Sequence, residues 1–175
     1  LSLPDPPPTV IVEAATLIHD CEQVIARLRA AHRPLILAGS GVRIAGAGAP
    51  LLALAEAAGI PIATAWTHDL IASAHPLFAG RPGTIGTRAG NFCLQACDFM
   101  LVIGSRLNIR QVSYNWSRFA PQAFIVQVDI DPAELAKPFV RPDLAIVADA
   151  ARFIPTLAAQ AALHDLPDYG DWARW

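Results

Sequence analysis

Hydrophobic residues gather along this chain in short runs, separated by segments with helical spacing. Residues 34–38 form a continuous apolar run in which polar and apolar positions do not alternate, as is typical of a parallel strand covered on both faces. Residues 99–103 and 124–129 are further apolar runs of strand length, and residues 60–64 and 144–148 are shorter ones. The pattern predicts the strands of one parallel sheet.

Amphipathic segments between these runs predict helices. Asp20 with Gln23 three residues later resembles a capping box, so we expect a first helix to start there and to end before the next strand. Its buried positions recur at helical spacing: Cys21, Val24, Ile25 and Leu28. A second helix is predicted from Pro50, a residue suited to a first turn, to Gly59, which closes it.

Capping residues mark three more helical starts. Thr87 is predicted to cap a helix whose Phe92 faces inward, and Asp131 caps a turn that begins with proline. The final helix follows either Asp143 or Asp149. Residues 66–90 are rich in glycine and proline and read as loops. Because strands alternate with helices, the fold class is α/β with a parallel sheet and right-handed crossovers.

Composition favours one buried, globular domain. Of 175 residues, 54% are hydrophobic and 16% are charged, and the net charge is −2, so there is no basic field for nucleic acid or anionic lipid. No apolar run is long enough for a membrane span and no signal peptide opens the chain. Three scattered cysteines suit a reducing compartment. We expect a cytoplasmic protein without nucleic-acid or membrane partners.

Both ends look like connecting segments. Residues 1–9 are rich in proline and read as a stiff interdomain linker. Residues 164–175 carry two tryptophans that need a surface to cover, and they read as a linker toward a further domain. Residues 10–163, which begin with a β-branched run at 10–12, form the domain between them. The chain is expected to be the middle piece of a longer polypeptide.

Glycines follow the first long strand, at Gly39-Ser40-Gly41. A turn from strand to helix can bind an anion through its backbone N–H groups. The alternative is a turn that lets strand and helix pack closely. A dinucleotide fingerprint would need a third glycine where Ile44 stands, so nicotinamide binding is not indicated.

Charged residues follow the next two strands. Asp129 is placed to accept the hydroxyls of an adenosine ribose, whereas Asp131 is mainly a structural cap. Arg106 is placed to reach a pyrophosphate with its bidentate fork, and an interdomain salt bridge is nearly as good an interpretation. Cys93 and Cys97 share a helix face but read as core residues. Apart from the weak pair of His68 and Asp69, nothing suggests a catalytic base, and no catalytic or metal-binding residue is predicted.

Taken in order, four segments resemble the central domain of thiamine-diphosphate-dependent enzymes, of the acetolactate synthase and 2-oxo-acid decarboxylase-like superfamily. These segments are residues 33–42, Gly83-Thr84, Gly104-Ser105-Arg106 and residues 129–135. The resemblance extends over about residues 10 to 160. It implies a doubly wound, mostly parallel, six-stranded Rossmann-like sheet with strand order 3-2-1-4-5-6.

The resemblance also implies a parent enzyme. In it, pyrimidine- and pyrophosphate-binding domains flank this one and hold thiamine diphosphate and Mg²⁺, in a homodimer or homotetramer. The parent is expected to be a lyase or transferase acting on 2-oxo acids. The Gly-Asp-Gly motif that holds the magnesium and diphosphate is absent from this chain, so the chain alone is expected to be inactive and to have a structural role.

Some members of the superfamily bind FAD in this domain, others ADP, and many neither. By resemblance, one set of residues lines an adenine-nucleotide groove: Gly39, Ser40, Gly41, Gly83, Thr84, Gly104, Ser105, Arg106, Asp129 and Ile130. The chain differs from the synthases in having Leu107 and Asn108 where they have an acidic pair. The alternative function is a free-standing nucleotide-binding regulatory module that uses the same groove.

Overall fold

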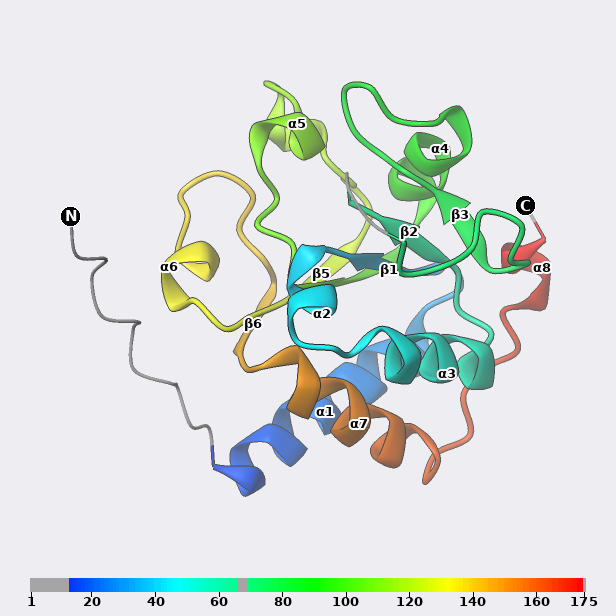
Figure 1. Cartoon of the computed structure of the whole chain (residues 1–175), viewed down its shortest axis with the longest axis vertical. Helices are drawn as coiled ribbons and strands as arrows, with labels where there is room; N and C mark the ends of the chain where they lie inside the picture. The colour runs from blue at the N-terminus through cyan, green and yellow to red at the C-terminus, as the bar shows by residue number, and fades with distance from the viewer. Residues whose placement is uncertain (1–12, 66–68, 175) are drawn as a thin grey trace.

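A single parallel sheet forms the centre of the fold in the computed structural model, which describes residues 13–65 and 69–174 (Figure 1). Six strands pair in the order β3-β2-β1-β4-β5-β6. The strands are β1 (Pro34–Ala38), β2 (Ile62–Thr64), β3 (Phe78–Gly80), β4 (Phe99–Ile103), β5 (Phe124–Asp129) and β6 (Leu144–Val147). The predicted fold class and strand order are confirmed. The predicted linker 1–9, the run 10–12 and His68 lie outside the described residues.

The two central strands account for the apolar runs of the sequence. Every residue of β1 and of β4 is buried, and the strands pair in register from Pro34 opposite Phe99 to Ala38 opposite Ile103. Alternate residues of each strand enter two separate core clusters, one on either face of the sheet. A strand that is covered on both faces needs apolar residues at every position, which is why it shows no alternation.

Long helices cover one face of the sheet. These helices are α1 (Ala14–Ala30), α3 (Gly48–Ala58) and α7 (Ala150–Ala161), and the short α2 (Ser40–Ile44) precedes α3. They form the lower layer in Figure 1. The start predicted for α1 at Asp20 is wrong, because Leu17 extends the buried stripe one turn toward the N-terminus, so the helix begins at Ala14 and Asp20 lies in its interior. Gly59 ends α3 in the left-handed conformation, as predicted.

Short elements cover the other face. They are α4 (Arg88–Ala96), α5 (Ile109–Val112), the 3₁₀ turn η1 (Trp116–Arg118) and α8 (Gly170–Ala173), while α6 (Pro132–Leu135) follows the end of β5. Thr87 caps α4 through the N–H of Gly90, as predicted. The inward orientation predicted for Phe92 is wrong, since this side chain is 59% exposed and Gly90 and Leu94 face the core. None of the helices in the described ranges has the length and apolar character needed to cross a membrane.

The edge strand β3 was missed in the sequence. It is three residues long and ends at Gly80, whose φ is +107°. A Cβ on Gly80 would lie 2.9 Å from the backbone nitrogen of Gly90, so only glycine allows the following helix to lie so close. Three residues are too few to show a period of two, and neighbouring glycine and proline favour a loop.

The tail is fastened to the domain by two aromatic side chains. The hydroxyl of Tyr169 donates to the Leu28 carbonyl at 2.6 Å, and Nε1 of Trp172 donates to the Pro34 carbonyl at 2.7 Å. Both side chains are buried. Burial raises the pKa of Tyr169 to about 12, so the phenol stays protonated and keeps its donor. The surface that the tail was expected to need is therefore supplied for Trp172 by β1 of the same chain, and Tyr169 adds a contact with α1. Trp175, the second tryptophan of the tail, lies outside the described residues.

We predict that Tyr169→Phe lowers the free energy of unfolding by about 1 kcal/mol, because the Leu28 carbonyl loses its donor from Tyr169. Urea denaturation of the chain measures this difference. Tyr114→Phe is the matched control, since Tyr114 is 82% exposed and the same atom is removed there. Equal stability of the two variants would contradict a fastening role for the Tyr169 hydroxyl.

Candidate functional site

A cavity of about 330 Å³ opens where β1, β4 and β5 end. The order of the strands reverses between β1 and β4, and ligands of doubly wound folds bind at such a switch point, outside the carboxyl ends of the strands. We call this cavity the switch-point groove. Residues of α2, of the end of β5 and of the segments after β4, β5 and β6 line it, together with the first residue of α7.

Six of the ten residues assigned to an adenine-nucleotide groove line this cavity. They are Ser40, Gly41, Gly104, Arg106, Asp129 and Ile130. Four others do not. Ser105 is buried beneath the turn, and its carbonyl accepts a hydrogen bond from Nε2 of Gln127 at 3.1 Å. The N–H of Gly83 donates to Asn91 and the hydroxyl of Thr84 to the carbonyl of Arg110, while Gly39 lies behind the lining in the contact described next.

The glycines after β1 pack against the turn after β4. A Cβ on Gly39 would overlap the carbonyl oxygen of Gly104, and a Cβ on Gly41 would lie 2.7 Å from the Cα of Gly104. The N–H of Gly41 donates to the Gly104 carbonyl at 2.9 Å. This amide is bonded within the protein, so of the two interpretations open in the sequence, the geometry favours close packing over an anion-binding turn.

Asp129 presents a buried carboxylate at the end of β5. It is 9% exposed, and its Oδ1 accepts a hydrogen bond from the N–H of Asp131 at 3.0 Å. Desolvation raises the pKa of Asp129, an effect that this hydrogen bond opposes and the nearby charge of Glu134 reinforces. Asp131 itself caps α6 by accepting from the N–H of Ala133 at 2.9 Å, which confirms its structural assignment.

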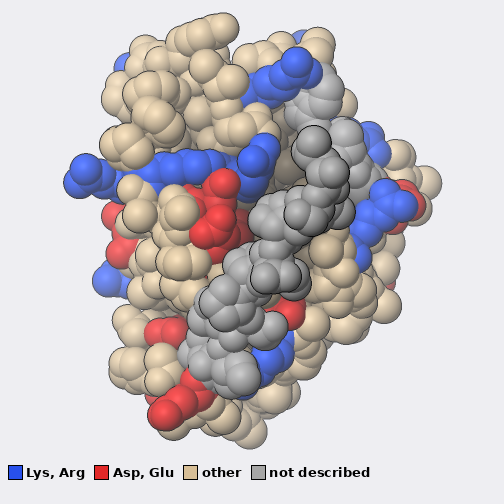
Figure 2. Space-filling view, turned by 60° about the vertical axis from the view of Figure 1, so that its left-hand side comes forward, with Lys and Arg blue, Asp and Glu red and all other residues tan. Residues whose placement is uncertain are grey.

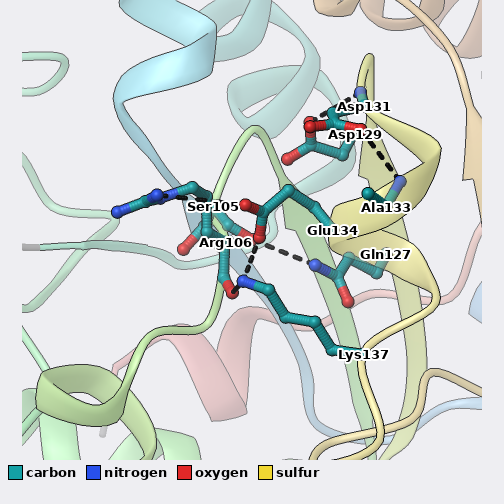
Figure 3. Close-up of polar contacts among 8 residues, drawn as sticks. All are labelled: Ser105, Arg106, Gln127, Asp129, Asp131, Ala133, Glu134 and Lys137. Carbon is teal, nitrogen blue, oxygen red and sulfur yellow. Dashed lines mark hydrogen bonds and ion pairs between the residues drawn. The ribbon is translucent and has the colours of Figure 1, made fainter.

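Arg106 lies in a small charged network on the α6 side of the groove (Figure 3). Its Nη1 lies 3.9 Å from Oε1 of Glu134, and its side chain is 67% exposed. Lys137 pairs with Glu134 and donates to the Arg106 carbonyl at 3.0 Å. The backbone of the turn after β4 is thus tied to α6, while the guanidinium forms an exposed, long ion pair that contributes little to stability.

Asp149 also lines the groove, and sequence reasoning assigned it to capping alone. Its Oδ1 accepts from the N–H of Ala151 at 2.8 Å at the start of α7. Because it follows β6, the rule that selected Asp129 after β5 also applies to it. Because the capping role already accounted for an aspartate at this position, the sequence offered no further reason to place Asp149 in the groove.

Side chains suited to holding a metal ion do not gather among the described residues. No three His, Cys, Asp or Glu side chains there are placed to hold a metal ion. Burial raises the pKa of Cys97 to about 12 and also raises that of Cys93, so both thiols stay protonated. His68, the predicted partner of Asp69, lies outside the described residues. Asp69 forms an ion pair with Arg43, with 3.3 Å between Oδ1 and Nη1. The switch-point groove therefore offers recognition, with carboxylates for hydroxyl groups and a guanidinium for an anion.

Comparison with known proteins gives a consistent set of relatives. The family described as thiamine pyrophosphate enzyme, central domain, matches residues 21–157. The probable acetolactate synthase large subunit of Methanocaldococcus jannaschii is 39% identical over 166 residues, which are 94% of this chain and 26% of that protein. The large subunit of Corynebacterium glutamicum acetolactate synthase is 35% identical over 159 residues (87% of this chain, 25% of that protein). For the isozyme 1 large subunit of Escherichia coli the identity is 39% over 140 residues (77% and 24%). The chain spans about a quarter of the length of each of these relatives.

We predict that Gly104→Ala lowers the free energy of unfolding by about 3 kcal/mol, because the added Cβ both strains a positive φ and collides with Gly41. Gly46→Ala is the matched control: its φ is also positive, at +66°, but no atom lies within 4 Å of an added Cβ. We expect about 1 kcal/mol for this variant from backbone strain alone. Urea denaturation of both variants tests the packing interpretation, which requires Gly104→Ala to be clearly the less stable of the two.

Proposed function

The chain belongs to the family of thiamine pyrophosphate enzyme central domains, and on this premise we propose that it is the non-catalytic middle domain of a longer enzyme of acetolactate synthase type. The observation that carries the proposal is coverage: the family match extends over most of the chain, and the chain matches about a quarter of each relative. The remaining three quarters of such a polypeptide would supply the flanking pyrimidine- and pyrophosphate-binding domains.

The parent enzyme, in this proposal, forms or breaks a carbon–carbon bond beside the carbonyl of a 2-oxo acid. Thiamine diphosphate supplies that chemistry when it is bound with Mg²⁺. The described residues of this chain contain no cluster that could hold the metal, so both would be held by other domains. The parent is proposed to be a cytoplasmic homodimer or homotetramer, in which this domain contributes subunit contacts.

The switch-point groove is proposed to take the adenosine diphosphate moiety that FAD and ADP share. Asp129 would accept the ribose hydroxyls, and Ile44, which lines the groove and is largely exposed, would cover the adenine ring. Arg106 would turn from Glu134 to the pyrophosphate, an exchange of one weak exposed pair for a bidentate one. Leu107 is buried and Asn108 caps α5, so neither adds a polar group to the groove. The proposal therefore concerns only the adenosine diphosphate moiety.

Calorimetry tests the parentage. The full-length parent is expected to bind thiamine diphosphate in the presence of Mg²⁺, and the 175-residue chain alone is expected not to bind it. Chelation of the metal should abolish binding by the parent, because in this proposal the cation would hold the diphosphate. A full-length protein that shows no heat of binding with Mg²⁺ present would contradict the proposal.

The groove is tested by titrating the chain with ADP and, separately, with FAD. We expect Asp129→Asn to weaken binding about tenfold, because the amide keeps one acceptor for the Asp131 N–H but loses the charged acceptor for the ribose. Asp165→Asn, an exposed change between α7 and α8, is the control.

The titration outcomes separate the alternatives. If neither nucleotide binds, the groove assignment is wrong while the parentage is unaffected. A chain that binds ADP, in a natural protein without further domains, would instead support the regulatory module.

A further inference from the structure

A second and larger cavity, of about 680 Å³, lies away from the switch-point groove, beside the edge strand β3. We call it the edge groove. Its walls come mainly from β3, from α4 and from α8, with Phe78, Phe92 and Trp172 as the aromatic side chains, and the segments before β2 and β3 complete them. Figure 1 shows α4 and α8 beside the edge strand β3. The volume lies within the range of small-molecule sites, about 300–1,000 Å³.

The walls of the edge groove are mainly apolar. In addition to the three aromatic side chains, Ala79, Ala96 and Cys93 line it. Burial raises the pKa of the Cys93 thiol, which therefore serves as an apolar contact and not as a nucleophile. Phe92 is 59% exposed although it lies on a helix whose other large apolar residue, Leu94, is buried. A large apolar side chain exposed beside a hollow of this size is typical of a binding surface.

Charge in the edge groove has one sign. Among the described residues that line it, none is acidic and two are arginines, Arg88 at the start of α4 and Arg174 directly after α8. Arg174 pairs with Asp171, whereas none of the carboxylates in the described ranges forms an ion pair with Arg88. The groove thus combines apolar walls with one uncompensated positive charge. A single negative charge on an apolar body complements this combination.

We propose that the edge groove binds a monocarboxylate with an unbranched hydrocarbon chain. The chain lies against Phe78, Phe92 and Trp172, and the carboxylate pairs with the guanidinium of Arg88. A guanidinium matches the two oxygens of a carboxylate in a bidentate pair. The site is independent of the nucleotide proposal, because the described residues that line the two grooves form separate sets.

Calorimetry with decanoate and octanoate below their micelle-forming concentrations, and with decanol below its solubility limit in water, tests the proposal on the 175-residue chain. Decanoate is expected to bind, with affinity falling about fourfold for each methylene removed, because each buried methylene contributes about 0.8 kcal/mol, which is that fold-change. Decanol should bind more weakly, since it lacks the charge that pairs with Arg88. Absence of binding, or equal affinity for decanoate and octanoate, would overturn the proposal.

Two variants locate the site, and both change exposed residues, so the fold is expected to persist. Arg88→Gln should weaken decanoate about fivefold and leave decanol unchanged, as expected for loss of an exposed ion pair. Arg152→Gln, an exposed change on α7 on the other face of the sheet, is the matched control. Phe92→Asp should weaken decanoate more than tenfold, because it removes one wall and adds a like charge.

Sedimentation of the same proteins separates a different occupant, a second copy of the chain. Three results together would show that the groove is a contact between copies: the unliganded chain dimerises, Phe92→Asp dissociates the dimer, and decanoate leaves the dimer unchanged. In that case the proposal fails. Equal decanoate affinity for Arg88→Gln and Arg152→Gln would also refute it. A monomeric chain in which decanoate affinity depends on Arg88 and Phe92 supports it.

Discussion

The contact between the turns that follow β1 and β4 is the constraint on which the site depends. Gly39 and Gly41 lie directly against the backbone of Gly104, where no side chain fits. Hydrogen bonds continue the contact across the sheet, from the N–H of Gly39 to the carbonyl of Ile103 and from the N–H of Gly104 to that of Val128. The two turns therefore meet backbone against backbone beneath the switch-point groove. Glycine at these positions serves the architecture first.

Unequal cover on the two faces of the sheet explains where the remaining surface features lie. Three helices of eleven or more residues cover one face, whereas the helices on the other are nine residues or shorter. The short elements leave the edge groove beside β3, and the fastened tail forms one of its walls. Charged side chains, by contrast, do not gather by sign: Figure 2 shows acidic and basic side chains interspersed on the face that comes forward there.

Much of the candidate site could be predicted from the sequence, from the residues at the ends of the predicted strands. Arg106 and Asp129 were selected because they follow apolar runs, and the parallel sheet brings both to one groove. Gly83 and Thr84 were assigned by resemblance alone, and they line a different part of the surface, where their polar groups bond to Asn91 and Arg110. Asp149 was missed as a lining residue because its cap of α7 explained it fully. These errors have one cause: when a residue has a role in local backbone geometry, the sequence does not also show which groove or surface its side chain faces.

The sequence by itself determined the fold class, most of the strands and the helix caps at Thr87 and Asp131, because these depend on residue periodicity and on hydrogen bonds within a few residues. It left the cap of the final helix open between Asp143 and Asp149, and the structure shows that Asp149 is the cap. Only the tertiary structure decided which face Phe92 presents, that Phe78–Gly80 completes the sheet, and that Tyr169 and Trp172 fasten the tail to residues more than 130 positions earlier. These outcomes depend on contacts between segments far apart in the chain. No local pattern encodes such contacts, because the partner of each residue is defined only once the sheet has formed.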